Sequence, residues 1–279
     1  MNKQQARSLL DVAYFLGMTA VALFLLSPVL WLVSASFQGP GEIFKVPFNW
    51  IPERISLDNY MYAWEVGHVG RALKNSVIVS VLMLVFHLFF NTISGYVIVK
   101  YPVKFKAALV VFILATMMLP QEITFLPVYN VVKSLGLVDS WLGLAAPFFF
   151  SGFGVFMMMQ FARAIPDEIL ESARIDGCSE YRIFFQIALP LLKSSIAALG
   201  IMAFSFIWNE FAWANIVVLS DQMRTLPLTL TLLAKSSDNS VKISALIPAS
   251  VTAMAPVMLL FFIFQRQFVA SVASSGVKG

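Results

Sequence analysis

The sequence of residues 165–190 is IPDEILESARIDGCSEYRIFFQIALP, a polar stretch between two strongly apolar ones. Pro166 suits the first position of a helix, and the acidic residues that follow it favour the positive end of the helix dipole. Gly177 can adopt the left-handed conformation that ends a helix. These features predict a helix over about 166–176.

A second short helix is predicted immediately after that turn. Ser179 can cap its first turn, and Pro190 disfavours a helical conformation for the residue before it. We therefore expect a helix over about 180–188 that Pro190 ends. The segment 163–193 as a whole is too polar to span a membrane, so it is predicted to be a helix–turn–helix loop outside the bilayer.

The whole chain has the composition of a membrane protein. Of its 279 residues, 59% are hydrophobic and 12% are charged, whereas soluble domains have about 45–50% apolar and about 25% charged residues. An ordinary soluble protein and a disordered chain are both excluded. The net charge is +4, but Lys and Arg are dispersed singly, so nucleic-acid binding is not indicated.

Few side chains are suited to metal binding or nucleophilic catalysis. Cys178 is the only cysteine, so no internal disulfide can form, and His68 and His87 are the only histidines. The sequence has no CxxC or HExxH motif and predicts neither a metal site nor a catalytic site. An intramembrane hydrolase is disfavoured because His87 alone cannot supply its catalytic constellation.

Six apolar segments are long enough to cross a bilayer, which takes about 20 residues. They lie at about 12–36, 75–99, 107–129, 141–162, 194–219 and 243–265. The first is longer than a signal-peptide core and is expected to be retained. The third is interrupted by Pro120-Gln121-Glu122. We predict an all-α polytopic membrane protein in which residues 1–279 form a single transmembrane domain.

The distribution of positive charge predicts the orientation. Six spans place both ends on the same side, and cytoplasmic loops carry an excess of Lys and Arg. The set that holds the termini and 163–193 is richer in these residues, and its segment 100–106 has three Lys and no acid. Both termini and the 163–193 loop are therefore predicted to be cytoplasmic. On the other side, residues 37–74 are expected to fold as an extramembrane loop with short interfacial helices.

Side chains of the 163–193 loop favour contact with a soluble partner. Glu171 and Arg174 lie three residues apart and can share one side of the first helix. The other candidates are small or aromatic residues and a further arginine: Ser172, Ala173, Tyr181, Arg182, Phe184 and Phe185. Such a mixture suits a docking surface. The alternative is a solvated loop that packs on its own bundle.

The spacing within this loop resembles a known family signature. Glu171-Ser172-Ala173, three residues, Gly177, nine residues and Ile187-Ala188-Leu189-Pro190 is similar to the EAA signature of ABC importer permeases. Ser172, where the family usually has Ala, is the one departure among the fixed positions. The run 165–177 resembles the carbohydrate branch. The run 224–228 and the ending Gly276-Val277-Lys278-Gly279 are similar to the second permease subunit of maltose-type systems.

This resemblance implies a multi-subunit importer. Two permease chains, expected to be a heterodimer, would form the path for a sugar or oligosaccharide, two ATP-binding subunits would dock beneath them, and an extracytoplasmic binding protein would deliver the sugar. Because the chain has no GxxxxGK[ST] motif, ATP and Mg are expected on the partner subunits, with no cofactor on this one. The loop would be the coupling helix, with Glu171 pairing with a basic residue of the ATPase. The residues that the resemblance assigns to coupling are Glu171, Ser172, Ala173, Asp176, Gly177, Ile187, Leu189 and Pro190.

Polar residues inside the predicted spans are candidates for lining the path, because ionisable groups there are costly unless they face a cavity or a partner. They are His87, Asn91, Glu122, Asn209 and Glu210. The alternative for each is hydrogen bonding between helices, which is favoured for His87 and Asn91. Trp208 and Trp213 have rings that could stack on a sugar.

The loop 220–242 resembles the family segment that contacts the docked binding protein. The residues concerned are Arg224, Thr225, Leu226 and Pro227, and the 37–74 loop is the other candidate. Two alternatives stay open for the function. An importer of glycerol-phosphate or a polyol on the same fold would favour basic residues in mid-span, which the chain lacks. An ion-coupled secondary transporter would need inverted repeats, which are not found, and would leave 163–193 without a role.

Overall fold

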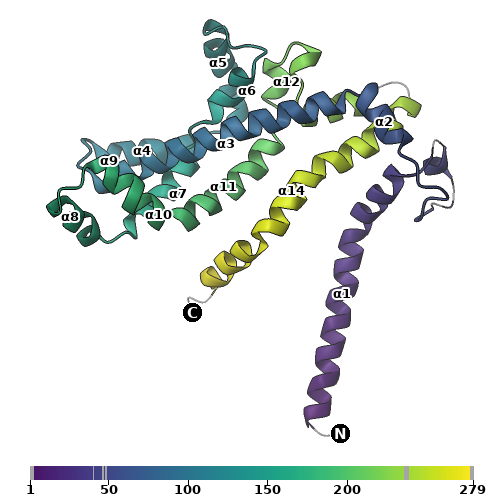
Figure 1. Ribbon diagram of the computed structural model, residues 1–279, viewed down its shortest axis with the longest axis horizontal. Helices are drawn as coiled ribbons and strands as arrows, with labels where there is room; N and C mark the ends of the chain where they lie inside the picture. The colour runs from purple at the N-terminus through teal and green to yellow at the C-terminus, as the bar shows by residue number, and fades with distance from the viewer. Residues whose placement is uncertain (1–2, 40, 46, 48, 236–238, 277–279) are drawn as a thin grey trace. The chain divides into compact units, whose positions relative to one another are not determined.

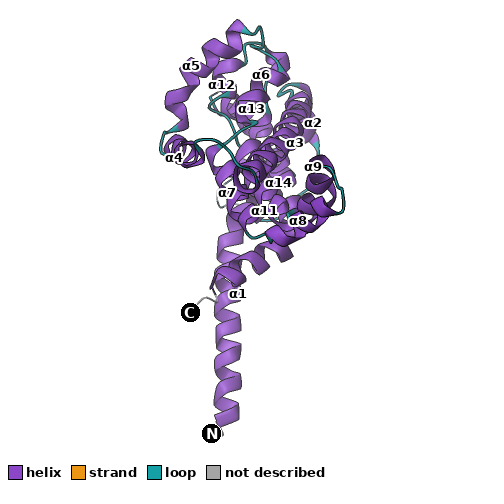
Figure 2. Cartoon of the chain, turned by 90° about the vertical axis from the view of Figure 1, so that its left-hand side faces the viewer, coloured by secondary structure: helices purple, strands orange, loops and turns teal. Residues whose placement is uncertain are grey.

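The computed structural model describes residues 3–39, 41–45, 47, 49–235 and 239–276. The helices and loops of this part of the chain include no strand, which confirms the all-α prediction for it (Figure 2). The chain divides into two compact units, residues 1–69 with 230–255 and residues 70–229 with 256–279. Of the tail compared with maltose-type permeases, residues 277–279 lie outside the described residues.

Three helices are individually long and apolar enough to cross a membrane: Asp11–Ser36 within α1 (Lys3–Ser36), α3 (Val69–Lys100), and Ala245–Ile263 within α14 (Asn239–Gly276). Three bent pairs of helices bring the number to six if each pair is one span. Length and composition thus agree with six predicted spans, and the crossings themselves stay a prediction.

Each bent pair has a break of a few residues. α4 (Lys106–Met117) meets α5 (Gln121–Ser134) at 105°, where the sequence predicts an interruption. Pro120 precedes α5 in an extended conformation with ψ 131°. Because a proline has no amide hydrogen, it cannot donate to the preceding turn and so cannot continue α4. The prediction of an interrupted third span is confirmed, although the helix continues to Ser134 rather than 129.

The fourth predicted span also contains a break, which the sequence analysis missed. It consists of α6 (Trp141–Ala145), the 3₁₀ turn η2 (Ala146–Phe148) and α7 (Gly152–Arg163), bent by 48°. The hydroxyl of Ser151 accepts a hydrogen bond from the Gly154 amide and caps α7. A serine between phenylalanines and glycines gave no strong signal for a helix start.

The fifth predicted span, 194–219, is wrong in extent. α11 (Lys193–Trp208) ends at Asn209, and a short α12 (Ala214–Val217) follows after a turn. The Glu210 carboxylate accepts hydrogen bonds from the Trp213 amide at 3.0 and 3.1 Å, which starts this new turn. Glu210 therefore lies beyond the helix and not inside it.

The prediction that Pro190 ends the second loop helix is also wrong. α9 (Glu180–Ile183) continues through a π-helical turn, η3 (Phe184–Ala188), into α10 (Leu189–Leu191). A wide turn suits this place because Pro190 has no amide hydrogen to donate to the preceding turn. The break comes two residues later, at Leu192 with φ −87° and ψ 0°, where α10 and α11 diverge by 72°.

Two of the apolar clusters in the described part of the unit 70–229 lie next to the candidate sites. One, around Met83, Phe148 and Trp213, joins α3 to α6, α11 and α12. The other, which we call the loop-side cluster, includes Tyr96, Met158, Leu170, Ala173, Ile183, Phe184, Ala188, Leu192 and Leu199. α8 (Asp167–Ile175) and α9 lie at the end of α3 where Lys100 stands (Figure 1).

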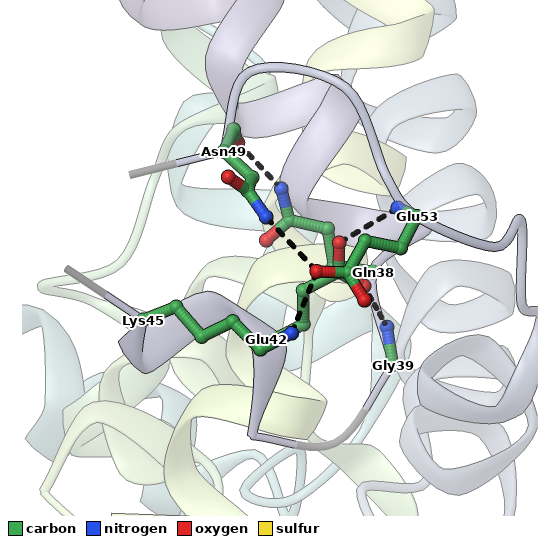
Figure 3. A network of polar contacts seen from close by, with 6 residues as sticks. All are labelled: Gln38, Gly39, Glu42, Lys45, Asn49 and Glu53. Carbon is green, nitrogen blue, oxygen red and sulfur yellow. Dashed lines mark hydrogen bonds and ion pairs between the residues drawn. The ribbon is translucent and has the colours of Figure 1, made fainter. Parts of the chain in front are cut away.

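The loop after α1 in the other unit has its own polar network (Figure 3). Glu42 accepts hydrogen bonds from the backbone amides of Glu53 at 2.7 Å and Gly39 at 3.3 Å, while Lys45 forms a 2.7 Å ion pair with Glu53. Two short helices, η1 (Glu42–Phe44) and α2 (Asp58–Glu65), lie within the predicted folded loop. The network gives hydrogen-bond partners to the backbone amides of Gly39 and Glu53 in this polar segment.

Candidate functional site: the 163–193 loop and the segment 209–227

The turn after α8 is a Schellman motif. Gly177 has φ +80°, its amide donates to the Arg174 carbonyl, and the Cys178 amide donates to the Ala173 carbonyl, both at 3.0 Å. This pair of hydrogen bonds is typical of a left-handed helix end. Cys178 then packs against the loop-side cluster. The predicted helix at 166–176 is observed as Asp167–Ile175.

The two faces of α8 have different environments. Leu170 and Ala173 are buried in the loop-side cluster, whereas Glu171, Ser172 and Ile175 are exposed, Ile175 to 86%. Ala173 thus faces its own bundle, unlike the exposed Glu171 and Ser172 that the resemblance also assigns to coupling. The small side chain of Ala173 lets α8 lie close to the bundle. The helical period places 170 and 173 on one side and 171 and 175 on the other.

The second half of the loop is divided in the same way. Phe184 is buried against Tyr96, with ring centroids 5.1 Å apart, so it is not the docking anchor that the sequence suggests. Tyr181 is 82% exposed and Phe185 is also exposed. The other assigned positions fall on both sides: Ile187 and Leu189 pack against the loop-side cluster, and Asp176 and Pro190 are exposed.

Arg174 does not pair with Glu171. Its guanidinium donates to the Glu180 carboxylate at 2.8 Å and lies 5.9 Å from the centre of the Tyr101 ring. The Tyr101 hydroxyl donates to the same carboxylate. Hydrogen bonds from Arg174 and then Tyr101 lower the pKa of Glu180, so the carboxylate stays ionised. Glu171 is left on the exposed face.

Lys100 contacts the start of α8, which the sequence analysis did not predict. Its ammonium donates to the Ile165 carbonyl and to the Asp167 carboxylate, both at 2.6 Å, and its side chain is only 5% exposed. The hydrogen bond and charge of Lys100 lower the pKa of Asp167. The sequence showed Lys100 only as a topological charge, because nothing local indicates a partner 67 positions away.

The segment 220–227 is held by the start of α3. The Asn75 side chain donates to the carbonyls of Gln222 at 2.7 Å and Arg224 at 3.0 Å, and the Leu226 amide donates to the Ser76 hydroxyl at 2.8 Å. The short turn η4 (Asp221–Met223) and the helix α13 (Leu226–Ala234) flank this anchor.

Two of the four predicted binding-protein contacts in this segment are wrong. Thr225 and Leu226 are buried, so they cannot touch a docked protein without rearrangement. Arg224 is partly exposed and forms an ion pair with Asp221. The sequence pattern does not reveal on which side of the segment each residue lies, and the contact of this segment with a binding protein stays a prediction.

Glu210 lines a small cavity of about 20 Å³, enough for about one water molecule. The polar residues around it also include Ser76, Ser80 and Thr225. Glu122 lies in the first turn of α5 and is not among the residues that line this cavity. Asn209, the residue before Glu210, is exposed and donates to the Ser205 carbonyl at 2.7 Å.

The two tryptophans near this cavity are not available for stacking on a sugar. Trp213 is 1% exposed, and its indole donates to the Gly143 carbonyl at 3.0 Å. Trp208 is buried as well, with its ring stacked on Phe204. Both belong to the packing of the bundle.

His87 and Asn91 tie α3 to the break in the fourth span. His87 is bonded through Nδ1 to the Phe148 carbonyl at 2.8 Å. Asn91 donates to the Phe149 carbonyl at 3.2 Å and accepts from the Ser151 amide at 3.0 Å. Both side chains are buried and serve free backbone groups, which is the structural alternative that the sequence favours for them.

This architecture, in which a polar helix–turn–helix packs at one end of an all-helical bundle, has clear relatives. Residues 88–274 match the family described as "Binding-protein-dependent transport system inner membrane component". The chain belongs to that family, and it is therefore a permease subunit of an ABC importer, a transport component of the inner membrane rather than an enzyme.

Individual relatives are similar over nearly the whole chain. The arabinooligosaccharides transport system permease protein AraQ of Halalkalibacterium halodurans is 34% identical over 99% of this chain and 100% of its own, and that of Bacillus subtilis is 34% identical over 98% and 97%. The diacetylchitobiose uptake system permease protein NgcG of Streptomyces coelicolor is 29% identical over 88% and 82%.

A solved bacterial ABC transporter involved in the import of the acidic polysaccharide alginate has the same fold. Its chain superposes with a TM-score of 0.82 at 19% identity, covering 95% of this chain and 98% of its own. A second alginate transporter structure, in complex with a pentasaccharide-bound periplasmic protein, gives a TM-score of 0.63.

Proposed function

We propose that the chain is one of two permeases that form the path for ATP-driven uptake of a sugar or oligosaccharide. The observation that carries the transport role is the exposed face of the 163–193 loop, which presents Glu171, Ile175 and Tyr181 away from the bundle. The saccharide cargo is supported by the relatives, three of which are named for arabinooligosaccharides or diacetylchitobiose.

The remaining partners follow from what this chain lacks and exposes. ATP and Mg would be bound by two partner subunits, because this sequence has no phosphate-binding loop motif. The second permease would cover apolar surface such as that of α1, whose residues 11–26 are all exposed. A binding protein would deliver the sugar on the opposite side. The Lys-rich segment 100–106 supports cytoplasmic termini.

In this proposal, the exposed carboxylate of Glu171 forms an ion pair with a basic residue of an ATP-binding subunit. Closure of the ATP-binding subunits then displaces the loop and turns the bundle between its inward-open and outward-open states. Glu122, Asn209 and Glu210 stay candidates for the path on the far side, and of the three Glu210 lines the polar cavity. The cavity beside Glu210 is too small for a sugar ring, so it would have to widen in another conformational state of the transporter.

A second candidate cargo is glycerol 3-phosphate. The sn-glycerol-3-phosphate transport system permease protein UgpE of Yersinia pestis is 28% identical over 95% of this chain. A phosphorylated cargo would favour basic side chains along the path, and none of the six predicted spans contains Lys or Arg in its interior. A neutral saccharide is therefore preferred.

The test combines partner identification with uptake. The chain is purified in mild detergent from its own membranes, and co-purifying proteins are identified by mass. A second permease together with a protein that carries an ATP-binding loop is the expected result. The complex is then reconstituted in liposomes with its binding protein, and uptake of labelled arabinotriose is compared with that of glycerol 3-phosphate. Uptake by this chain alone without ATP would refute the proposal.

A further inference from the structure

Two consecutive residues at the cytoplasmic end of α3 hold both helices of the 163–193 loop. Lys100 donates to Ile165 and Asp167 at the start of α8. Tyr101 donates to Glu180 at the start of α9. Arg174, near the end of α8, joins the same carboxylate and lies over the Tyr101 ring. We call Lys100, Tyr101, Asp167, Arg174 and Glu180 the clamp.

The clamp is more than a set of surface ion pairs. Exposed pairs contribute little because solvent screens them and the side chains must be ordered. Lys100 differs because its side chain is 5% exposed and meets two acceptors at 2.6 Å, one of them a backbone carbonyl. Removing the ammonium would leave the partly covered Ile165 carbonyl without this donor, and leaving an acceptor unsatisfied costs more than the net value of an ordinary hydrogen bond.

Apolar packing reinforces the same connection. Tyr96, one turn before the clamp on α3, packs against Phe184 of the loop. A Cβ atom at Gly95 would come within 2.8 Å of the Met159 backbone nitrogen, so α3 and α7 approach as closely as a glycine allows. α7 leads directly into α8. The loop, α3 and α7 are therefore joined by buried contacts as well as by the clamp.

The chain on the other side of the loop is connected differently. Between α10 and α11 the backbone breaks at Leu192, and the two helices diverge by 72°. A sharp bend between two helices is a place where their angle can change, whereas the α3 side has a buried lysine, a tyrosine hydroxyl and close-packed backbones. A displacement of the loop would thus be passed on more directly to α3 than to α11.

We infer that Lys100 and Tyr101 are positioning residues through which displacement of the 163–193 loop drives α3. α3 is also the helix whose other end carries Asn75 and Ser76, which hold the segment 220–227. A single rigid helix thus connects the loop that would meet the ATPase with the segment that would meet the binding protein. The inference rests on the proposed importer function and names how its two ends communicate.

The test uses the complete complex in liposomes, with its binding protein and arabinotriose as the probe. Three variants are compared with the wild type: Lys100→Met, which removes the charge, Lys100→Arg, which keeps it, and Tyr101→Phe, which removes one hydroxyl. The readouts are basal ATP hydrolysis, the factor by which the binding protein stimulates it, and arabinotriose taken up per ATP. Both the stimulation factor and the uptake per ATP depend on the same connection between the loop and α3, so both should fall together.

For Lys100→Met we expect basal hydrolysis within about twofold of the wild type, while stimulation and uptake per ATP fall about tenfold. Lys100→Arg should restore both ratios to within about twofold. If the complex with Lys100→Met does not assemble, the Tyr101→Phe variant tests the inference, and we expect it to lower the stimulation factor and the uptake per ATP about threefold. Unchanged ratios in Tyr101→Phe and Lys100→Met, or a proportional loss of basal hydrolysis and uptake, would overturn the inference.

The proposal of a saccharide cargo and the inference about the clamp can be refuted separately. If the wild-type complex hydrolyses ATP and responds to its binding protein but takes up no arabinotriose, the saccharide proposal fails and the stimulation factor still tests the clamp. If the wild type neither co-purifies with an ATP-binding subunit nor responds to ATP, the proposed function itself fails. A wild type that transports, with variants that lose neither ratio, contradicts the clamp alone.

Discussion

The 163–193 loop and the segment 209–227 are both polar stretches next to apolar helices, yet they use their polar residues differently. The loop buries its apolar residues and leaves Glu171 and Tyr181 exposed. The segment 209–227 buries Thr225 and turns the Glu210 carboxylate towards its own backbone. The loop therefore has side chains free to meet an outside partner, whereas much of the other segment is occupied in holding its own turns.

The largest effect should come from removing the packing of the segment 209–227. Trp213→Ala deletes a fully buried indole and its hydrogen bond to Gly143, and should lower the free energy of unfolding by about 3–5 kcal/mol. Thermal unfolding of the detergent-purified complex measures this. Trp50→Ala is the matched control, because Trp50 is 58% exposed and its truncation should cost much less. Equal losses in both variants would contradict the assignment of Trp213 to the core.

A substitution on the exposed face of the loop should instead reduce transport and leave the stability unchanged. Glu171→Arg reverses an exposed charge, so thermal unfolding should stay unchanged while uptake falls about 30-fold or more, since a mispaired charge at an interface costs about 2–5 kcal/mol. Glu168→Arg, also exposed on α8, is the control and should transport normally. Normal uptake by Glu171→Arg would remove the coupling role from this residue.

A smaller effect is expected at the turn of the loop. Gly177→Ala places a Cβ at φ +80°, and the left-handed conformation costs an L-residue about 1–2 kcal/mol. Gly200→Ala is the control because it lies within α11 and its Cβ would make ordinary contact with Leu88. Hydrogen exchange of the Cys178 amide should increase only in Gly177→Ala. Equal exchange in the two variants would show that the turn does not depend on glycine.

The smallest effect concerns acid. The pKa of Asp167 is lowered by Lys100, so its ion pair is fully present above the ordinary aspartate pKa and is lost as the pH falls through the lowered value. We expect proteolysis within 163–193 to become faster on acidification below about pH 4, and Asp167→Asn to be equally fast at neutral pH. A loop with the same cleavage rate at both pH values would contradict this role of the pair.

A matching acid response is expected beside the segment 209–227. Desolvation raises the pKa of Asp139, but hydrogen bonds from Ser220 and Leu219 outweigh it, and the net shift is downward. This contribution to stability is likewise present above the ordinary pKa and lost as the pH falls through the lowered one. Asp139→Asn should therefore make cleavage near Leu219 faster at neutral pH, and an unchanged rate would exclude the contact.

The sequence predicted those features that depend on local chemistry. Pro166, Gly177 and Ser179 mark the start, turn and second start of the loop because each acts through its own backbone or cap, and the structure shows all three. The break at Pro120 was predictable for the same reason. The helical fold class followed from apolar segment length.

The features that depend on distant partners could not be predicted. Nothing near Lys100 in the sequence indicates Asp167, and nothing near Asn75 indicates Gln222. Ala173 and Phe184 were assigned to a docking surface because composition does not reveal which side of a short helix faces the bundle. The path residues Glu122 and Glu210 were found as polar exceptions in apolar sequence, and only the fold shows that the Glu210 carboxylate accepts from the Trp213 amide.

The π-helical turn at Phe184–Ala188 sets the rotational phase between the loop and α11. It holds one residue more than an α-helical turn would, and each residue turns an α-helix by about 100°. Deleting Gln186 would convert this turn to an ordinary one and rotate everything after it by about that angle, so that Leu199 would leave the loop-side cluster. The one additional residue in the π-helical turn therefore determines which face of α11 packs against its neighbours.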